Sequence, residues 1–127
     1  MYKRQALAAL NGGREFITEQ KKSYKKRRDL TVGFLNKIDG ITCNNPEGSF
    51  YVFPSCDGLY GKKTPDGKII QNDIDVCKYI LETAEVTVVP GSVFGMIDFF
   101  RICYAIDTNP LLEALKRILT VIHKLKK

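Results

Sequence analysis

Arg101 is the residue whose type and setting in this sequence most directly predict chemistry. It lies in the apolar run 99–105, whose aromatic and β-branched residues are typical of a strand. Because strand side chains alternate between two faces, Arg101 shares its face with the other odd-numbered residues of the run, which are apolar. A guanidinium in such a setting is costly unless it is paired, and its planar fork fits a carboxylate through two parallel hydrogen bonds. The residues alone leave two partners open, a carboxylate of the protein or a carboxylate of a ligand.

The cysteines and the single histidine do not have the spacing of a metal site. No two cysteines form a CxxC pair, whereas a structural zinc needs about four clustered ligands. His123 lies near the end of the last predicted helix, where a cationic ring suits the helix dipole. The apolar surroundings of the thiols predict reduced, partly buried cysteines of a cytoplasmic protein, and no metal. The cysteines are Cys43, Cys56, Cys77 and Cys103.

Two glycine-containing segments have some residue types of phosphate or serine chemistry but lack the spacing. In the segment 58–64, Cys56 stands where a phosphate loop needs its first glycine, and Pro65 follows where a helix should begin. In the segment 91–95, Ser92 is one position away from the centre that a nucleophile elbow requires. The sequence therefore predicts neither a nucleotide-binding loop nor a serine hydrolase.

The net charge of +6 is concentrated in one dense basic run and in the C-terminal tail. Such a run is either a nucleic-acid patch or the solvated face of a helix. In a helix its residues would spread around most of the circumference, and only Tyr24 is interleaved as an aromatic. The solvated face is the favoured interpretation, and no nucleic-acid partner is expected. The run comprises Lys21, Lys22, Lys25, Lys26, Arg27 and Arg28.

Alternating helical and strand patterns surround Arg101 and predict an α/β fold in which helices pack against a small mixed sheet. Helices are indicated by apolar residues at helical spacing, by Asn72 as an N-cap and by Pro110 in the first turn of the last helix. Strands are indicated by β-rich runs bounded by glycine and proline. The predicted order is a helix over 1–10, a long helix over 14–38, strands over 41–43 and 49–54, a loop over 55–71, a helix from 72, strands over 86–89 and 99–105, and a last helix from 109.

The helix predicted over residues 14–38 is long for a chain of 127 residues. It would span about 38 Å, so part of it should bridge to something beyond a domain of this size. Its apolar or aromatic stripe runs through Ile17, Tyr24, Thr31, Phe34, Leu35 and Ile38. The first helix lacks an N-cap of its own and ends at residues 11–13, so it resembles the end of a larger unit.

Membrane and secretory segments are not apparent in the sequence. No apolar run approaches the roughly 18 residues of a membrane span. The apolar stretch 6–10 is shorter than the core of a secretory signal. We therefore expect no membrane association and a cytoplasmic location.

Five segments together resemble one enzyme family, the class I aminotransferases that depend on pyridoxal phosphate, specifically bacterial aspartate aminotransferases. Each segment alone is modest, but they occur in the right order across essentially the whole chain. They are Gln5 to Gly12 (QALAALNG), Tyr24 to Asp29 (YKKRRD), Pro46 to Pro54 (PEGSFYVFP), Val88 to Gly95 (VVPGSVFG) and Phe100 to Ala105 (FRICYA).

The resemblance implies a role for Arg101 and a position for this chain in the fold of the family. The corresponding arginine binds the α-carboxylate of the substrate, which favours the ligand over the protein as the partner of Arg101. The turn that contains Gly91 would carry the substrate-side loop, and Ser49 and Phe50 would lie near the entrance of the site. The chain would be the small domain of a fold-type I enzyme: residues 1–13 would be a remnant of the large domain, 14–38 a long interdomain helix, and 39–127 the C-terminal small domain.

The resemblance also implies which functional groups this chain lacks. The family's Schiff-base lysine, the aspartate that pairs with the pyridine nitrogen and the phosphate-binding residues would all lie upstream. We therefore expect no catalytic and no cofactor-binding residue in this chain, no pyridoxal phosphate bound to it, and no catalysis by it alone.

In the full-length enzyme, the resemblance implies transfer of an amino group, with aspartate expected as the donor, to a 2-oxo acid such as 2-oxoglutarate or oxaloacetate. Pyridoxal phosphate would be the cofactor, and the enzyme would be a homodimer. The alternative is a non-catalytic basic α/β interaction module. A reading frame that continues upstream of Met1 into a lysine-bearing aminotransferase domain would exclude that alternative.

Overall fold

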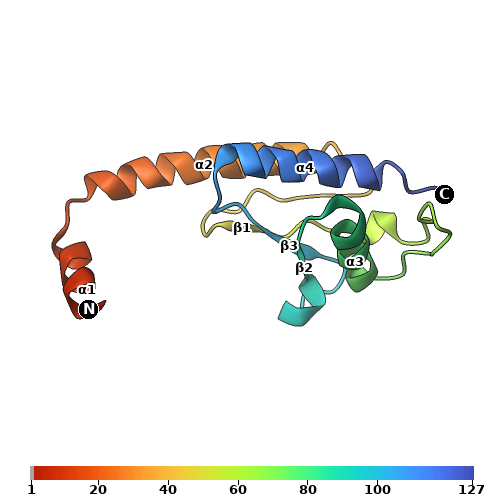
Figure 1. The fold of residues 1–127 in the computed structure, drawn as a ribbon, viewed down its shortest axis with the longest axis horizontal. Coiled ribbons are helices and arrows are strands. Elements are labelled where there is room, and N and C mark those ends of the chain that lie inside the picture. The colour runs from red at the N-terminus through yellow and green to blue at the C-terminus, as the bar shows by residue number, and fades with distance from the viewer. Residues whose placement is uncertain (1) are drawn as a thin grey trace.

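The computed structural model describes residues 2–127, with helices and short strands in alternation (Figure 1). Met1, which the sequence places in the first helix, lies outside the described residues. The α/β class with helices packed on a small sheet is confirmed. The elements are α1 (Tyr2–Asn11), α2 (Glu15–Leu35), β1 (Tyr51–Val52), the 3-10 turn η1 (Asp57–Leu59), α3 (Asp73–Ala84), β2 (Val89–Pro90), the 3-10 turn η2 (Gly91–Phe94), β3 (Phe100–Cys103) and α4 (Thr108–Ile122).

The sheet has the order β1-β3-β2, so β3, which carries Arg101, lies in the middle. Both pairs are antiparallel: Tyr51 lies opposite Cys103, and Val89 lies opposite Arg101. The sequence predicted a mixed sheet, but the described strands form no parallel pair. The connection from β2 to β3 is too short for the crossover that a parallel pair needs, so it reverses the chain direction.

The segments 41–43 and 49–54 were predicted as neighbouring strands, but the structure gives only a bridge between Thr42 and Ser55, one residue beyond the second segment. The amide of Ser55 donates to the Thr42 carbonyl over 2.7 Å, and the Thr42 amide donates back over 3.3 Å. The strand pairing of β1 is instead with β3, which lies about fifty positions further along the chain. The segment before β1 contains Ser49 at a φ of 67°, a left-handed conformation that interrupts an extended strand.

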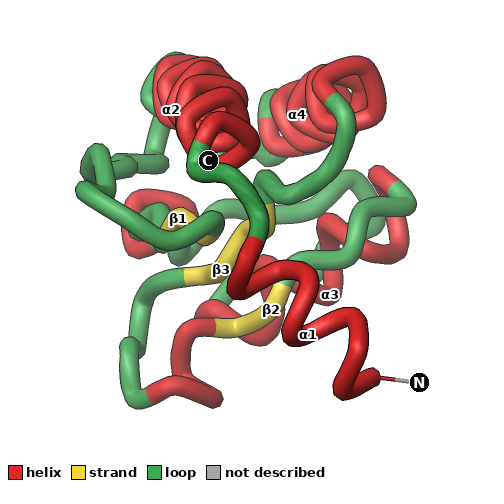
Figure 2. Tube along the Cα trace, turned by 90° about the vertical axis from the view of Figure 1, so that its left-hand side faces the viewer, coloured by secondary structure: helices red, strands yellow, loops and turns green. Residues whose placement is uncertain are grey.

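One face of the sheet is covered by α2 and α4, which lie side by side when the molecule is seen end-on (Figure 2). One apolar stripe of α4 is buried, because its residues recur at helical spacing and face the sheet. β3 contributes Phe100 and Ile102 to the same core, and β1 contributes Val52. The buried residues of α4 are Leu111, Leu115, Ile118, Val121 and Ile122.

The third helix, α3, contacts α4, β2 and η2. Asn72 is its N-cap, as predicted: the side-chain oxygen accepts a hydrogen bond from the Asp75 amide over 2.9 Å. The helix ends at Glu85, which adopts the left-handed conformation common at helix C-termini, with a φ of 56°. This arrangement places the start of α3 beside the turn that precedes β3.

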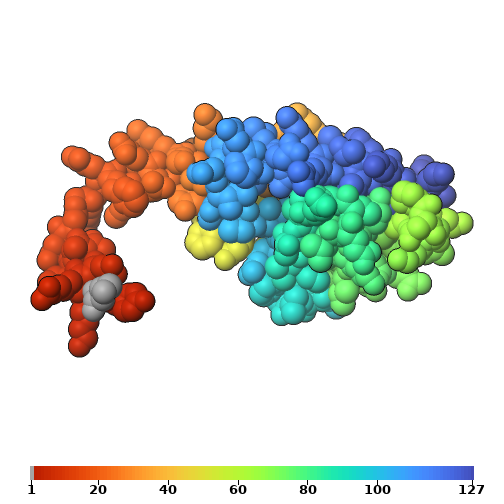
Figure 3. All heavy atoms as spheres, viewed as in Figure 1, coloured from red at the N-terminus to blue at the C-terminus, as the bar shows by residue number. Residues whose placement is uncertain are grey.

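α1 and the first part of α2 form an arm that stands clear of the rest of the molecule (Figure 3). Residues 2–19 are all exposed, and they include Tyr2, Leu10, Phe16 and Ile17 at between 62 and 86% exposure. α2 ends at Leu35 rather than at residue 38, and only Thr31 and Leu35 of it are buried. In the described residues, no helix is long and apolar enough to cross a membrane.

Candidate functional site

Arg101 lies on the open face of the sheet, turned away from the core beneath the helices. Burial alternates along β3: Phe100 and Ile102 are buried, whereas Arg101 is half-buried and Cys103 is exposed. The alternation predicted for this strand is therefore present, but the face that carries Arg101 is partly solvated. This position lowers the desolvation cost of the guanidinium and leaves it accessible.

Two aromatic rings hold the Arg101 guanidinium. Its carbon lies 4.4 Å from the centroid of the Tyr51 ring and 4.2 Å from that of Phe94. Tyr51 is diagonal to Arg101 across the β1–β3 pair, while Phe94 is the last residue of η2. The Phe94 ring is itself packed edge-on against Phe53, with centroids 5.9 Å apart. A cation over an aromatic face is stabilised by about 0.5–2 kcal/mol, so both contacts orient the guanidinium.

Neither aromatic contact uses the hydrogen-bonding capacity of Arg101. Aromatic faces attract the charge but do not accept the in-plane N–H bonds of the fork. Within residues 2–127, Arg101 makes no ion pair with an Asp or Glu and no side-chain hydrogen bond. Of the two partners that the sequence left open, the described part of the chain thus does not supply the protein carboxylate.

The turn that brings Phe94 to Arg101 depends on Gly91. Its amide donates to the Phe99 carbonyl over 2.7 Å, and its own carbonyl accepts from the Met96 amide over 2.9 Å. A Cβ atom at this position would lie 2.3 Å from the Met96 oxygen, so a larger residue cannot occupy it without moving the backbone. Gly91 therefore lies at the site, where it permits the tight turn.

Ser49 and Phe50 lie one step further from Arg101. The Ser49 carbonyl accepts a hydrogen bond from the Tyr104 hydroxyl over 2.8 Å. The Phe50 ring lies 4.6 Å from that of Tyr51, between centroids, and both Ser49 and Phe50 line a surface hollow of about 310 Å³ against α2. The structure thus places Gly91 at the end of the β2–β3 pair that contains Arg101, and it places the Phe50 ring against Tyr51, the ring that contacts Arg101.

Tyr51 and Phe94 are the site residues that the sequence analysis missed. Tyr51 follows directly from the β1–β3 register, which is not visible in the sequence. Phe94 lies in a segment of the family resemblance in which the sequence analysis gave a role only to Gly91. The one available signal was that both aromatics occur in the segments of the family resemblance that surround Arg101.

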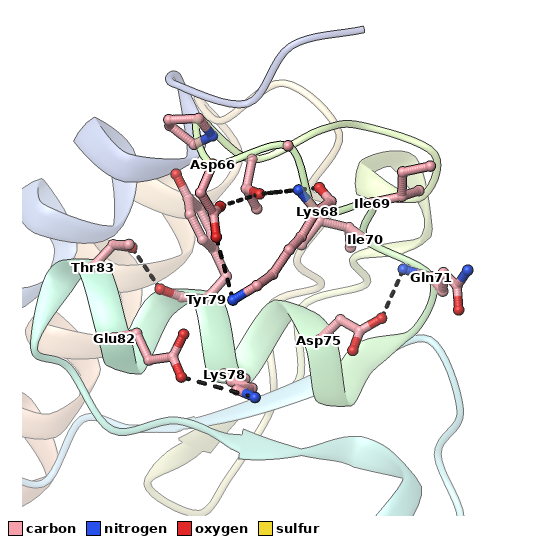
Figure 4. Close-up of a pocket in the computed structure, with 13 residues that line it drawn as sticks. Asp66, Lys68, Ile69, Ile70, Gln71, Asp75, Lys78, Tyr79, Glu82 and Thr83 are labelled. Atoms are coloured by element: carbon pink, nitrogen blue, oxygen red, sulfur yellow. Dashed lines mark hydrogen bonds and ion pairs between the residues drawn. The ribbon is translucent and has the colours of Figure 1, made fainter.

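A larger groove, of about 690 Å³, lies elsewhere, between the loop 64–71 and α3 (Figure 4). Its charged side chains form ion pairs with one another: Lys68 pairs with Asp66 at 3.2 Å, and Lys78 pairs with Glu82 at 3.9 Å. The carboxylate of Asp75 accepts from the Gln71 amide over 3.0 Å. The Arg101 guanidinium, by contrast, is not matched by a carboxylate of the described residues, so its face of the sheet is the candidate site.

The buried cysteines provide neither a reactive thiolate nor a metal site in the described residues. Burial raises the pKa of Cys43 to about 11 and the pKa of Cys56 and of Cys77 to about 12, so these thiols are protonated at neutral pH. Cys103 is exposed, which differs from the partly buried setting predicted for the cysteines. The described residues contain no group of three or more His, Cys, Asp or Glu side chains placed to hold a metal ion.

The lysines do not have the environment of an imine-forming residue. Such a lysine is typically desolvated, or lies beside another cation, so that its amine loses its proton. Every lysine of the described residues except Lys62 is exposed, and the Lys62 amine lies 3.6 Å from the Asp39 carboxylate. The residues present therefore do not fit a site for a carbonyl cofactor.

Comparisons with known proteins give the same assignment as the five segments. The family model described as "Aminotransferase class I and II" matches residues 2–118. An aspartate aminotransferase of Rhizobium meliloti (strain 1021) is 52% identical over 120 residues, which cover 94% of this chain and 29% of that protein. A probable aspartate/prephenate aminotransferase of Rhizobium leguminosarum bv. phaseoli is 51% identical over 113 residues, which cover 89% of this chain and 28% of that protein.

Solved structures show that the fold is shared as well. The aspartate aminotransferase from Rhizobium meliloti superposes with a TM-score of 0.92 at 50% identity, over 95% of this chain and 30% of that one. An alanine aminotransferase from Pyrococcus furiosus superposes with a TM-score of 0.79 at 31% identity, over 93% of this chain and 28% of that one. The chain spans less than a third of the length of these relatives. On this evidence the chain belongs to the family of class I and II aminotransferases.

Proposed function

We propose that this chain is the small-domain part of a pyridoxal-phosphate-dependent aminotransferase and that Arg101 binds the α-carboxylate of the amino-acid substrate. The observation that carries the proposal is the position of the guanidinium, between Tyr51 and Phe94, without a carboxylate partner in the described residues. Its planar fork offers two parallel N–H bonds, which match a carboxylate. Such a clamp fixes the orientation of the bound amino acid, and orientation is a large part of the rate advantage of an enzyme.

The proposed substrates are aspartate, as the amino donor, and a 2-oxo acid such as 2-oxoglutarate or oxaloacetate, as the acceptor. The relatives support this choice, since their names specify aspartate or aspartate and prephenate. The α-carboxylate is common to all these amino and oxo acids. Arg101 would therefore contact every substrate, and other residues would select the side chain.

Pyridoxal phosphate is the proposed cofactor of the longer enzyme, where it supplies the electron sink for amino-group transfer. The chain's own residues do not fit a site for it, because the lysines are exposed or, for Lys62, paired with Asp39. The contribution of this chain is thus confined to the carboxylate of the substrate. The chain alone is proposed to bind no cofactor and to be inactive.

The proposed domain division assigns residues 1–13 to the large domain, 14–38 to an interdomain helix and 39–127 to the small domain. The exposed apolar side chains of the arm, such as Leu10 at 83% and Phe16 at 67%, support it, because they lack a covering surface in this chain. A homodimer is proposed for the complete enzyme. The cytoplasm is the proposed location, in keeping with the free, buried Cys43, Cys56 and Cys77.

The test uses a complete enzyme in which this chain replaces the matching segment of the Rhizobium meliloti aspartate aminotransferase. We expect transaminase activity, and we expect Arg101→Ala to lower kcat/KM roughly 30- to 5,000-fold, the loss for a charged contact whose partner is left unpaired. Arg101→Lys should restore only part of the activity, because a point charge cannot form the two-bond fork. Cofactor absorbance should be unchanged in both variants.

Arg117→Ala is the matched control, because Arg117 is an exposed arginine on α4 whose ion pairs are with Glu113, at 3.0 Å, and with Glu85, at 3.5 Å. We expect its kcat/KM to stay within about twofold of the parent. If Arg101→Ala instead lowered the melting temperature and left kcat/KM of the folded enzyme near normal, the substrate-carboxylate assignment would be wrong.

A further inference from the structure

Asp73 is a buried carboxylate that the proposed chemistry does not use. It is only 3% exposed, and its Oδ2 atom accepts a hydrogen bond from the Ser92 amide over 2.8 Å. It is the first residue of α3, where the helix dipole favours a negative charge. No cationic side chain of the described residues pairs with it. Burying a carboxylate without a cationic partner is costly, so the position of Asp73 and its bond to the Ser92 amide need a structural reason.

The bond links α3 to the turn η2, and η2 carries one of the two rings that hold Arg101. Ser92 is the second residue of η2, and Phe94 is the last. Backbone bonds close the turn on itself, from the Gly95 amide to the Ser92 carbonyl over 3.1 Å. In the described residues, Asp73 is the only side chain that bonds the backbone of η2. The position of the turn relative to α3 thus depends on this carboxylate.

We infer that Asp73 is a positioning residue for the Arg101 site: it fixes η2, so that the Phe94 ring covers one face of the Arg101 guanidinium. This inference rests on the function proposed for Arg101. Without the bond, η2 would still form its internal turn and stay anchored at Gly91, whose amide donates to the Phe99 carbonyl, but its later residues could pivot about that anchor and the Phe94 ring would leave the guanidinium. Arg101 would then sample more rotamers, and ordering it upon substrate binding would cost conformational entropy.

A purely structural role for Asp73, as a residue that only stabilises the start of α3, makes different predictions. Asp75 provides the comparison, since it has the same side chain in the same helical turn and also accepts a backbone hydrogen bond, from Gln71. In the described residues, no hydrogen bond links the Asp75 side chain to η2. Loss of either carboxylate removes a favourable charge and a hydrogen bond at the helix start, but only loss of Asp73 frees the turn.

The experiment is a double-mutant cycle in the complete transaminase described above. We expect Asp73→Ala to raise KM for aspartate roughly 3- to 30-fold, the range of one cation–aromatic contact, while kcat stays within about twofold. Asp73→Asn, whose amide oxygen still accepts from Ser92, should return KM to within about threefold of the parent. Phe94→Leu should raise KM by a similar factor, and Asp73→Ala should add less than about twofold to it, because the ring through which Asp73 acts is already absent.

Asp75→Ala is the control and should leave KM within about twofold of the parent even if its melting temperature falls. Additive effects of Asp73→Ala and Phe94→Leu on KM would overturn the inference, and so would an equal rise in KM for Asp75→Ala. If Asp73→Ala does not fold, the comparison of Asp73→Asn with the parent decides: a KM raised more than tenfold, at a normal melting temperature, contradicts the role given to the hydrogen bond. A normal kcat/KM in Arg101→Ala would instead show that the proposed function itself fails.

Discussion

The guanidinium carbon of Arg101 lies 4.4 Å from the centroid of the Tyr51 ring, although the two residues are far apart in the sequence. The antiparallel register of β1 and β3 produces this contact: Tyr51 lies opposite Cys103, two positions from Arg101 and on the same face of the sheet. Diagonal neighbours in such a pair are within reach of long and aromatic side chains. The strand pairing, rather than any local motif, therefore orients the proposed carboxylate clamp.

Two substitutions at Tyr51 should distinguish the contribution of its ring to substrate binding from that of its hydroxyl. We expect Tyr51→Leu to raise KM for aspartate roughly 3- to 30-fold in the complete enzyme, because it removes the aromatic face beneath the guanidinium. Tyr51→Phe keeps that face and should stay within about twofold of the parent. Steady-state kinetics of both variants is the measurement, with melting temperatures to verify folding. An equal loss in the two variants would show that the hydroxyl, and not the ring, matters.

The strand around Arg101, and the alternation of its faces, could be predicted because both are local properties of the residues 99–105. The sequence could not predict whether Arg101 faces the helices or the opposite side, because this depends on which side of the sheet α2 and α4 cover. Burial of Phe100 and Ile102, which places Arg101 on the open side, is settled only by this tertiary packing. The same holds for Tyr51 and Phe94, whose contacts with Arg101 need a long-range register and a turn.

Local patterns predicted the long helix α2 but not which part of it is buried. Its existence follows from helical periodicity, and α2 is indeed the longest helix, with 21 residues. Its predicted apolar stripe, however, is buried only at its C-terminal end, where Thr31 faces the core, while Ile17 is 62% exposed. Periodicity indicates which face of a helix is apolar, but not whether anything in the chain covers that face.

Reaction of the 127-residue chain with pyridoxal phosphate, followed by borohydride reduction, should label many lysines weakly rather than one lysine fully. The physical reason is that the described lysines are exposed, apart from Lys62, so none has the desolvated amine that favours adduct formation. Peptide mass mapping after reduction is the measurement, and the parent Rhizobium meliloti enzyme is the positive control. Stoichiometric labelling of a single lysine would contradict the view that this chain provides no cofactor site.

Because of the buried thiols, the free energy of unfolding should fall in alkaline solution. Burial raises the pKa of Cys56 from 9.0 to about 12, and the pKa of Cys77 to a similar value. Below about pH 9 the thiols are protonated in both the folded and the unfolded chain, so they cause no change in the free energy of unfolding. Above that pH the unfolded chain releases their protons while the folded chain retains them, so the free energy of unfolding should fall until the folded pKa is reached.

We expect each buried thiol to contribute a slope of about −1.4 kcal/mol per pH unit to the free energy of unfolding between its unfolded and folded pKa values. Cys56→Ala should therefore make the decline between about pH 9.5 and 11 shallower by up to that amount. The Asp98 carbonyl keeps its bond from the backbone amide of residue 56, so the variant leaves no unpaired acceptor there. Urea unfolding at a series of pH values is the measurement. Cys103→Ala is the control, because Cys103 is exposed and its loss should leave the slope unchanged. If the slope were equally steep in the parent and in Cys56→Ala, the Cys56 thiol would not resist ionisation in the fold.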